Sequence, residues 1–104
     1  MTRITLQYFD DCPNWKTTDF HLTTLIAEGL DATVDHESID SYQTALERGF
    51  CGSPTVLIDG TDPFAVPGAD AALACRIYIT ERGPAGSPTI DQLRRAIAGA
   101  GASG

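Results

Sequence analysis

The chain has 104 residues, 42% of them hydrophobic and 8% aromatic, so it can bury one modest core and is expected to form one domain. Its net charge of −7 and its pI near 4.4 argue against a basic surface that follows phosphates, so we expect no nucleic-acid partner. No apolar run approaches the roughly 20 residues of a membrane span or the core of a signal peptide, which predicts a cytoplasmic protein with no membrane partner.

The first forty residues predict a strand, a helix and a second strand. Arg3–Phe9 alternates apolar and polar residues with the period of two that is typical of a strand. From about Asn14 to Glu28 the apolar residues recur at helical spacing, and Gly29 is the expected stop. Residues 32–39 form a weaker, polar strand that suits a sheet edge. Such a unit forms a parallel strand pair with a right-handed crossover.

A short helix and the most apolar strand are predicted next. Asp40 and Gln43 have the spacing of a capping box, which opens a helix that runs to Arg48 and stops at Gly49 in a left-handed conformation. Residues 54–60 are too short and too apolar for a surface helix, so they predict a central strand.

The region after the central strand predicts a loop and a last strand. Residues 61–74 contain two prolines and a glycine, which favours a loop with at most one helical turn. Residues 76–80 alternate like a strand, and we expect them to pair antiparallel with residues 54–60. The predicted order is therefore β-α-β-α-β-β-α, an α/β fold with a mixed four-stranded sheet flanked by helices.

A final helix closes the predicted domain. Residues 83–88 have the composition of a hinge, and Thr89 with Gln92 forms a second capping box. The helix is expected to end near Ala98, which gives a domain over residues 1–98 and a flexible tail over 99–104.

Cys12 is the main candidate for chemistry. It follows a predicted strand and precedes a predicted helix, where the first helical amides stabilise a thiolate, the reactive form of cysteine. Lys16 also favours the thiolate, whereas Asp10 and Asp11 oppose it. The aspartates and the proline after Cys12 favour an exposed thiol over a buried one.

Two motifs at matching positions resemble the thioredoxin-like superfamily. They are Cys-Pro-Asn-Trp (residues 12–15) at the first strand-to-helix junction and Gly-Ser-Pro-Thr (residues 52–55) before the third strand. The resemblance covers residues 3–98 and implies the four-stranded thioredoxin-like sheet. In place of the usual second active-site cysteine, this chain has Trp15.

The resemblance also assigns roles to individual residues. It makes Cys12 the nucleophile, and it implies a cis peptide at Pro54 beside the thiol. Cis bonds are nearly confined to X–Pro, and one here would turn the backbone of Ser53 toward an incoming peptide or thiol. The implied substrate-binding residues are Pro13, Trp15, Ser53 and Pro54, although Trp15 also lies in the apolar stripe of its helix and suits the core.

A thiol at position 12 needs a partner to resolve a mixed disulfide. Cys51 is the best candidate because it lies three residues before Pro54, but a bridge requires α-carbons within about 7 Å. A small external thiol is the alternative. Cys75 is expected to be a packed strand residue unless the loop over residues 61–74 folds back.

No metal or cofactor site is predicted. No cysteine or histidine pair has ligand spacing, and His21 and His36 are expected to be solvated. The glycine-rich segment over residues 83–88 lacks the spacing of a phosphate-binding loop, so nothing favours a nucleotide.

The leading interpretation is a thiol–disulfide oxidoreductase whose partner is a thiol or disulfide protein or a small thiol. A non-catalytic thioredoxin-like binding module is the second. The third is a protein that handles mercurials. The sequence segments YFDDCPNW, GSPTVLIDG, DPFA and CRIY are similar to those of small bacterial thioredoxin-like proteins, some of which are labelled as related to organomercury lyase. For that chemistry Cys12 and Cys51 would supply soft thiolates, and Asp10 or Asp11 would protonate the released carbon.

Overall fold

Three helices and seven short strands make up the α/β fold over residues 2–103, the part of the chain that the computed structural model describes. The chain begins with a strand, a helix and a parallel strand, as the sequence predicts. Several later elements are shorter than predicted or differ from the prediction. In chain order the elements are β1 (Thr2–Tyr8), α1 (Trp15–Ala27), β2 (Ala32–Ser38), α2 (Tyr42–Arg48), β3 (Cys51–Ser53), β4 (Thr55–Ile58), β5 (Ala72–Cys75), β6 (Tyr78–Thr80), β7 (Gly83–Ala85) and α3 (Ile90–Ser103).

The main sheet has three strands in the order β2-β1-β4. β1 pairs parallel with β2 and antiparallel with β4, so the sheet is mixed, as predicted. The predicted fourth strand is absent from this sheet: β6 pairs with β7 in a separate hairpin. The physical reason lies just before β6, where β5 pairs with β3 and holds the incoming chain away from the free edge of β4.

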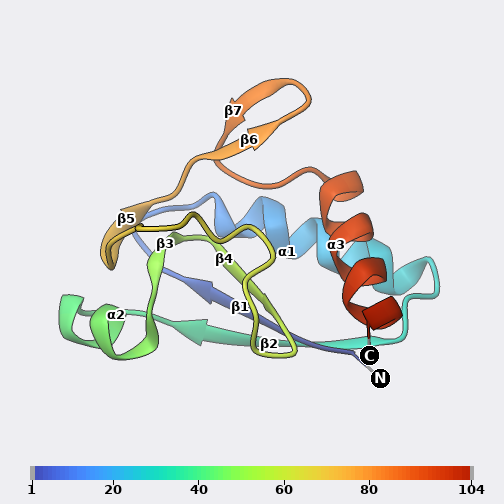
Figure 1. Ribbon diagram of the computed structural model, residues 1–104, viewed down its shortest axis with the longest axis horizontal. Coiled ribbons are helices and arrows are strands. Elements are labelled where there is room, and N and C mark those ends of the chain that lie inside the picture. The colour runs from blue at the N-terminus through green and yellow to red at the C-terminus, as the bar shows by residue number, and fades with distance from the viewer. Residues whose placement is uncertain (1, 104) are drawn as a thin grey trace.

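The core lies between the sheet and two helices. α1 and α3 cover the same face of the sheet, which Figure 1 shows with the helices side by side. Alternate residues of the strands point to this face, because side chains of a strand alternate between its two sides. The buried residues of this core are Ile4 and Leu6 of β1, Leu22 and Leu25 of α1, Val56 and Ile58 of β4, and Leu93 and Ile97 of α3.

Helix ends follow local sequence chemistry in most places. Gly49 ends α2 with φ of 66°, as predicted, whereas the residue that caps its start is Ser41 rather than Asp40: the Ser41 hydroxyl accepts from the Thr44 amide at 3.1 Å. The Thr89 and Gln92 capping box is confirmed, with reciprocal bonds of 2.9 and 3.1 Å. α3 continues to Ser103 and does not end near Ala98, so most of the segment predicted as a tail is helical.

The strand predicted to be central lies at an edge: β1 is in the middle of the sheet, and β4 pairs on one side only. The predicted loop after β4 contains a strand. β5 lies within and just beyond residues 61–74 and pairs parallel with β3, with Ser53 opposite Cys75. α2 lies beside this pair, at the end of the molecule far from α3 (Figure 1). A small second core of Ile39, Ala45 and Phe50 lies between α2 and the β3–β5 pair. The predicted hinge over residues 83–88 begins with β7.

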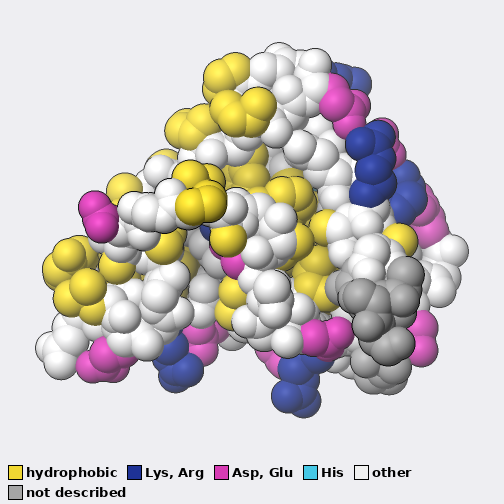
Figure 2. Space-filling view, in the orientation of Figure 1, with side chains coloured by type: hydrophobic (Ala, Val, Ile, Leu, Met, Phe, Trp, Pro, Cys, Tyr) yellow, Lys and Arg dark blue, Asp and Glu magenta, His cyan; other side chains and the backbone are white. Residues whose placement is uncertain are grey.

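On the face shown in Figure 2, charged side chains lie mainly along the rim, both beside α3 and along the lower edge by α2 and β2. Beside α3, Arg94 pairs with Glu28 at 3.0 Å and Arg95 with Glu81 at 3.4 Å. Hydrophobic side chains gather over the opposite side, around β5, β6 and α2. None of the helices within residues 2–103 has the length and apolar character that crossing a bilayer requires.

Candidate functional site

Cys12 lies in the connection between β1 and α1 but is buried rather than exposed. Its amide donates to the carbonyl of Phe9 at 2.9 Å, which closes a turn, and the residue is only 1% exposed. The turn leaves Asp10 and Asp11 in solvent, as their charge requires. The expectation of an exposed thiol is therefore wrong, because a segment distant in sequence covers it.

That segment carries Cys75, which forms a disulfide with Cys12. The two cysteines are 63 positions apart, and their α-carbons are 5.7 Å from each other. Cys75 is exposed although Cys12 is buried. The loop over residues 61–74 thus folds back, and Cys75 is not the packed strand residue that the sequence led us to expect.

Cys51, the expected partner, is a free thiol. Its sulfur lies 3.5 Å from the carbonyl oxygen of Gly49 and 3.8 Å from that of Ala69. The thiol can donate a hydrogen bond to either carbonyl oxygen. Of the two residues predicted as catalytic, the structure places only Cys12 in the bridge.

The peptide between Ser53 and Pro54 is cis, as the resemblance implies. Ser53 contacts both segments that carry the bridged cysteines: its hydroxyl accepts from the amide of Phe9 at 2.9 Å, and its carbonyl accepts from the amide of Arg76 at 2.9 Å. The same carbonyl oxygen lies 3.7 Å from the sulfur of Cys12. The side chains of Ser53 and Pro54 are fully buried. In this structure these two residues therefore pack beside the disulfide and do not face solvent.

Pro13 and Trp15, the other two residues predicted to bind substrate, follow Cys12 in the sequence. Pro13 is exposed. Trp15 is half-buried; its ring stacks on that of Tyr8 with centroids 4.4 Å apart and meets His36 edge-on at 6.4 Å. Trp15 therefore packs beside the main core, and Pro13 is the member of the predicted substrate-binding set that solvent reaches most freely.

Arg76, which sequence reasoning missed, organises the chain next to the disulfide. Only 9% of the residue is exposed, and its guanidinium donates to the Asp62 carboxylate at 2.7 Å and to the Phe64 carbonyl at 2.5 Å. It also lies 4.7 Å from the centre of the Tyr78 ring. The sequence holds one signal for this pair: Arg76 begins a predicted strand that is otherwise largely apolar, and Asp62 lies in the predicted loop before it.

Tyr78 connects this cluster to the cis peptide. Its hydroxyl donates to the carbonyl of Pro54 at 2.5 Å. Burial raises the pKa of Tyr78 well above the ordinary value of 10.0, Arg76 partly opposes this, and the Asp62 carboxylate adds to it. The hydroxyl therefore stays protonated and remains a donor throughout the physiological range.

Gly52 permits the close approach of β3 to the chain around Arg76. Its φ is +117°, and a β-carbon added there would lie 2.9 Å from the β-carbon of Arg76. We expect Gly52→Ala to lower the free energy of unfolding by about 1–3 kcal/mol, measured by urea denaturation. Gly49→Ala is the matched control, because φ there is +66° with open space around it and only the backbone cost of about 1 kcal/mol applies. Equal losses in the two variants would contradict the steric argument.

The bridge offers an incoming thiol one exposed cysteine, Cys75, and one buried cysteine, Cys12. A thiolate attacks a disulfide at an accessible sulfur, and the other sulfur leaves as a thiolate. Here the accessible residue is Cys75, and the leaving sulfur would be that of Cys12, three residues before the first residue of α1. Helix amides at that end favour a negative charge.

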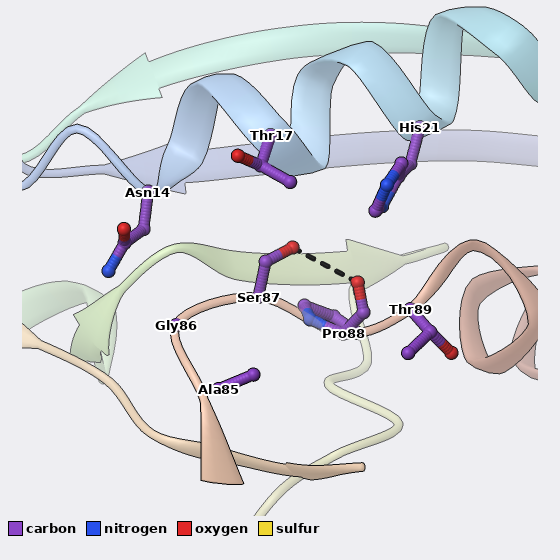
Figure 3. Close-up of a pocket in the computed structure, with 8 residues that line it drawn as sticks. All are labelled: Asn14, Thr17, His21, Ala85, Gly86, Ser87, Pro88 and Thr89. Atoms are coloured by element: carbon purple, nitrogen blue, oxygen red, sulfur yellow. Dashed lines mark hydrogen bonds between the residues drawn. The ribbon is translucent and has the colours of Figure 1, made fainter. Parts of the chain in front are cut away.

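A separate pocket of about 210 Å³ lies between α1 and the segment that leads into α3, as Figure 3 shows. Thr18 and Ser87 join the two sides through their hydroxyls at 2.7 Å. His21 is partly buried rather than solvated, and its Nδ1 has no hydrogen-bond partner among the described residues. The pocket has no cysteine in its lining, which consists of Asn14, Thr17, His21, Ala85, Gly86, Ser87, Pro88 and Thr89.

Within residues 2–103 no three histidine, cysteine or acidic side chains gather in a way that could hold a metal ion. Comparison of the chain with protein-family models, curated proteins and solved structures finds no match, so its resemblances stand on the residues and geometry described above.

Proposed function

We propose that the protein is a thiol–disulfide oxidoreductase of thioredoxin-like fold whose redox couple is Cys12 and Cys75. The observation that carries the proposal is the disulfide that joins a buried cysteine at the start of a helix to an exposed one on a folded-back segment. The mixed sheet and the cis peptide beside Cys12 support the fold assignment. Cys75 takes the place that the sequence suggested for Cys51.

The exchange runs in two steps. The thiolate of a substrate attacks the sulfur of Cys75, forming a mixed disulfide and releasing Cys12 as a thiolate that takes up a proton. A second substrate thiol attacks the substrate sulfur of the mixed disulfide and releases Cys75. The substrate pair loses two electrons and becomes a disulfide, and the protein disulfide gains them and becomes two thiols. In the reverse direction Cys75 attacks a substrate disulfide, and Cys12 resolves the intermediate.

The test compares turnover of a small disulfide by the protein and by three single variants. With 2-hydroxyethyl disulfide and reduced glutathione, Cys75→Ser is expected to reduce the rate to that of the reagents alone, whereas Cys12→Ser should keep part of the rate, because glutathione itself can release Cys75 from the mixed disulfide. Cys51→Ser is the matched control and should keep the full rate, because its thiol is outside the bridge. Full activity in Cys75→Ser would contradict the assignment of the couple.

A non-catalytic binding module gives a different result. Its disulfide would serve as a cross-link, so the protein would show no turnover although Cys12 and Cys75 stay bridged. For mercurial handling, reduction would free two thiolates on residues with α-carbons 5.7 Å apart, a soft donor pair for a soft metal. That proposal requires one mercury per reduced protein by intact mass, lost in the Cys12→Ser/Cys75→Ser double variant and retained in Cys51→Ser.

A further inference from the structure

Three exposed aliphatic side chains lie on the segments that flank the disulfide. Val66 is 63% exposed, Ile77 63% and Ile79 74%, values that are unusual for large aliphatic residues. We call this set the aliphatic patch. Ile77 follows Cys75 by two residues, so their α-carbons are at most about 7 Å apart.

The patch borders two hollows in the surface. One has a volume of about 310 Å³ and the other about 240 Å³, and both are lined by Ala65, Val66, Arg76 and Ile77. Figure 2 shows hydrophobic side chains gathered on this side of the molecule. Cys75 does not line either hollow, but it directly precedes Arg76, which lines both; the larger hollow is also lined by the free thiol Cys51. The hollows therefore give aliphatic side chains of a partner a place to enter near the disulfide.

Charge defines which partner fits. The charged residues that line the hollows are Asp62 and Arg76, and they neutralise each other at 2.7 Å. The chain as a whole carries a net charge of −7, so the hollows are a locally neutral part of an acidic protein. A partner segment that is apolar and free of acidic residues complements this surface, whereas a small anionic thiol gains nothing from it.

We propose that the aliphatic patch docks polypeptide segments in which aliphatic residues flank a cysteine, and that it presents their sulfur to Cys75. The proposal rests on the redox couple proposed above and deepens it by naming the substrate class. A partner residue two positions from the reacting cysteine matches the spacing of Cys75 and Ile77, because two extended residues span about 7 Å and their side chains point to the same face. Burial of aliphatic surface then raises the local concentration of the substrate thiol.

The experiment measures how fast the Cys12–Cys75 disulfide is reduced by three thiols. These are a short peptide with leucine and valine two positions before and after its one cysteine, the same peptide with serines in those positions, and reduced glutathione. The single tryptophan, Trp15, lies three residues from Cys12 and provides the fluorescence signal. We expect the aliphatic peptide to react about tenfold faster than the serine peptide, the equivalent of about 1.4 kcal/mol.

Surface variants locate the effect. Ile77→Ser/Ile79→Ser and Val66→Ser are expected to remove most of the tenfold difference, because they take apolar surface from the patch. Phe20→Ser and Leu46→Ser are matched controls, since these residues are 68% and 55% exposed on α1 and α2, and both should keep the difference. Equal rates for the two peptides with the unmodified protein would overturn the proposal.

A failed redox couple and a failed docking surface give different results. If dithiothreitol and all three thiols leave the disulfide intact, the redox function fails; if every thiol reacts and the peptides do not differ, the docking surface alone fails. Binding of fluorescent aliphatic and serine peptides to Cys75→Ser tests docking without any exchange. Preferential binding of the aliphatic peptide that Ile77→Ser/Ile79→Ser abolishes supports the surface, and its absence overturns it.

Discussion

Replacing Arg76 by leucine is expected to lower the free energy of unfolding by about 3 kcal/mol. The change removes the guanidinium from Asp62 Oδ2 and from the Phe64 carbonyl, although Asp62 Oδ1 still accepts from the Phe64 amide. Removing one partner of a buried ion pair costs about 3–5 kcal/mol. We expect the lower end of that range, because 19% of the Asp62 side chain remains in solvent and water can partly replace the guanidinium. Urea denaturation of oxidised protein measures the loss.

Two further variants test whether the loss comes from breaking the buried ion pair or merely from removing an arginine. Arg94→Leu removes an arginine from an exposed pair with Glu28 and is expected to cost much less than Arg76→Leu, because solvent screens such a pair. Asp62→Leu/Arg76→Leu removes both buried partners and should recover part of the loss of Arg76→Leu, because no uncompensated charge remains. A loss below 1 kcal/mol for Arg76→Leu would show that the cluster does not stabilise the folded chain.

Removing the disulfide is expected to lower the free energy of unfolding by about 4 kcal/mol. The bridge closes a loop between cysteines 63 positions apart, and the chain-entropy relation for a loop of that length gives this value at 25 °C. The measurement is urea denaturation of Cys12→Ala/Cys75→Ala against oxidised protein. Reduced protein without substitutions should unfold close to the double variant.

Cys51→Ala is the control for this comparison. It removes a free thiol that is only partly buried, so we expect a loss well below that of the double variant under oxidising conditions. If oxidised and reduced protein unfolded at the same urea concentration, the bridge would not restrict the unfolded chain as proposed.

Together the two features explain how an exposed sulfur is held in place. Arg76 ties the start of the 61–75 segment to the chain after β5, through Asp62 and Phe64. The disulfide ties the end of the same segment to the start of α1. Between these anchors β5 pairs with β3, and Ala71 and Leu73 pack against the second core, so several contacts hold the segment that carries Cys75.

Elements governed by neighbours in sequence could be predicted. The alternation of residues 3–9, the left-handed Gly49 and the capping box of Thr89 and Gln92 each depend on a few adjacent residues, and the structure shows all of them. The position of Cys12 at a strand-to-helix junction followed from the same local patterns. The cis peptide at Pro54 is different: the resemblance to thioredoxin-like proteins implies it, whereas local sequence does not, since only about 5–6% of X–Pro bonds in folded proteins are cis.

The features that depend on residues far apart in sequence could not be predicted. Ala72–Cys75 has little strand propensity and becomes a strand because β3 lies beside it. Cys12 looks exposed among its neighbours, and its burial follows from the segment that carries Cys75, 63 positions later. Local sequence therefore placed a cysteine at the start of a helix, whereas long-range packing selected Cys75 as its partner, because pairing depends on which α-carbons the folded chain brings within reach.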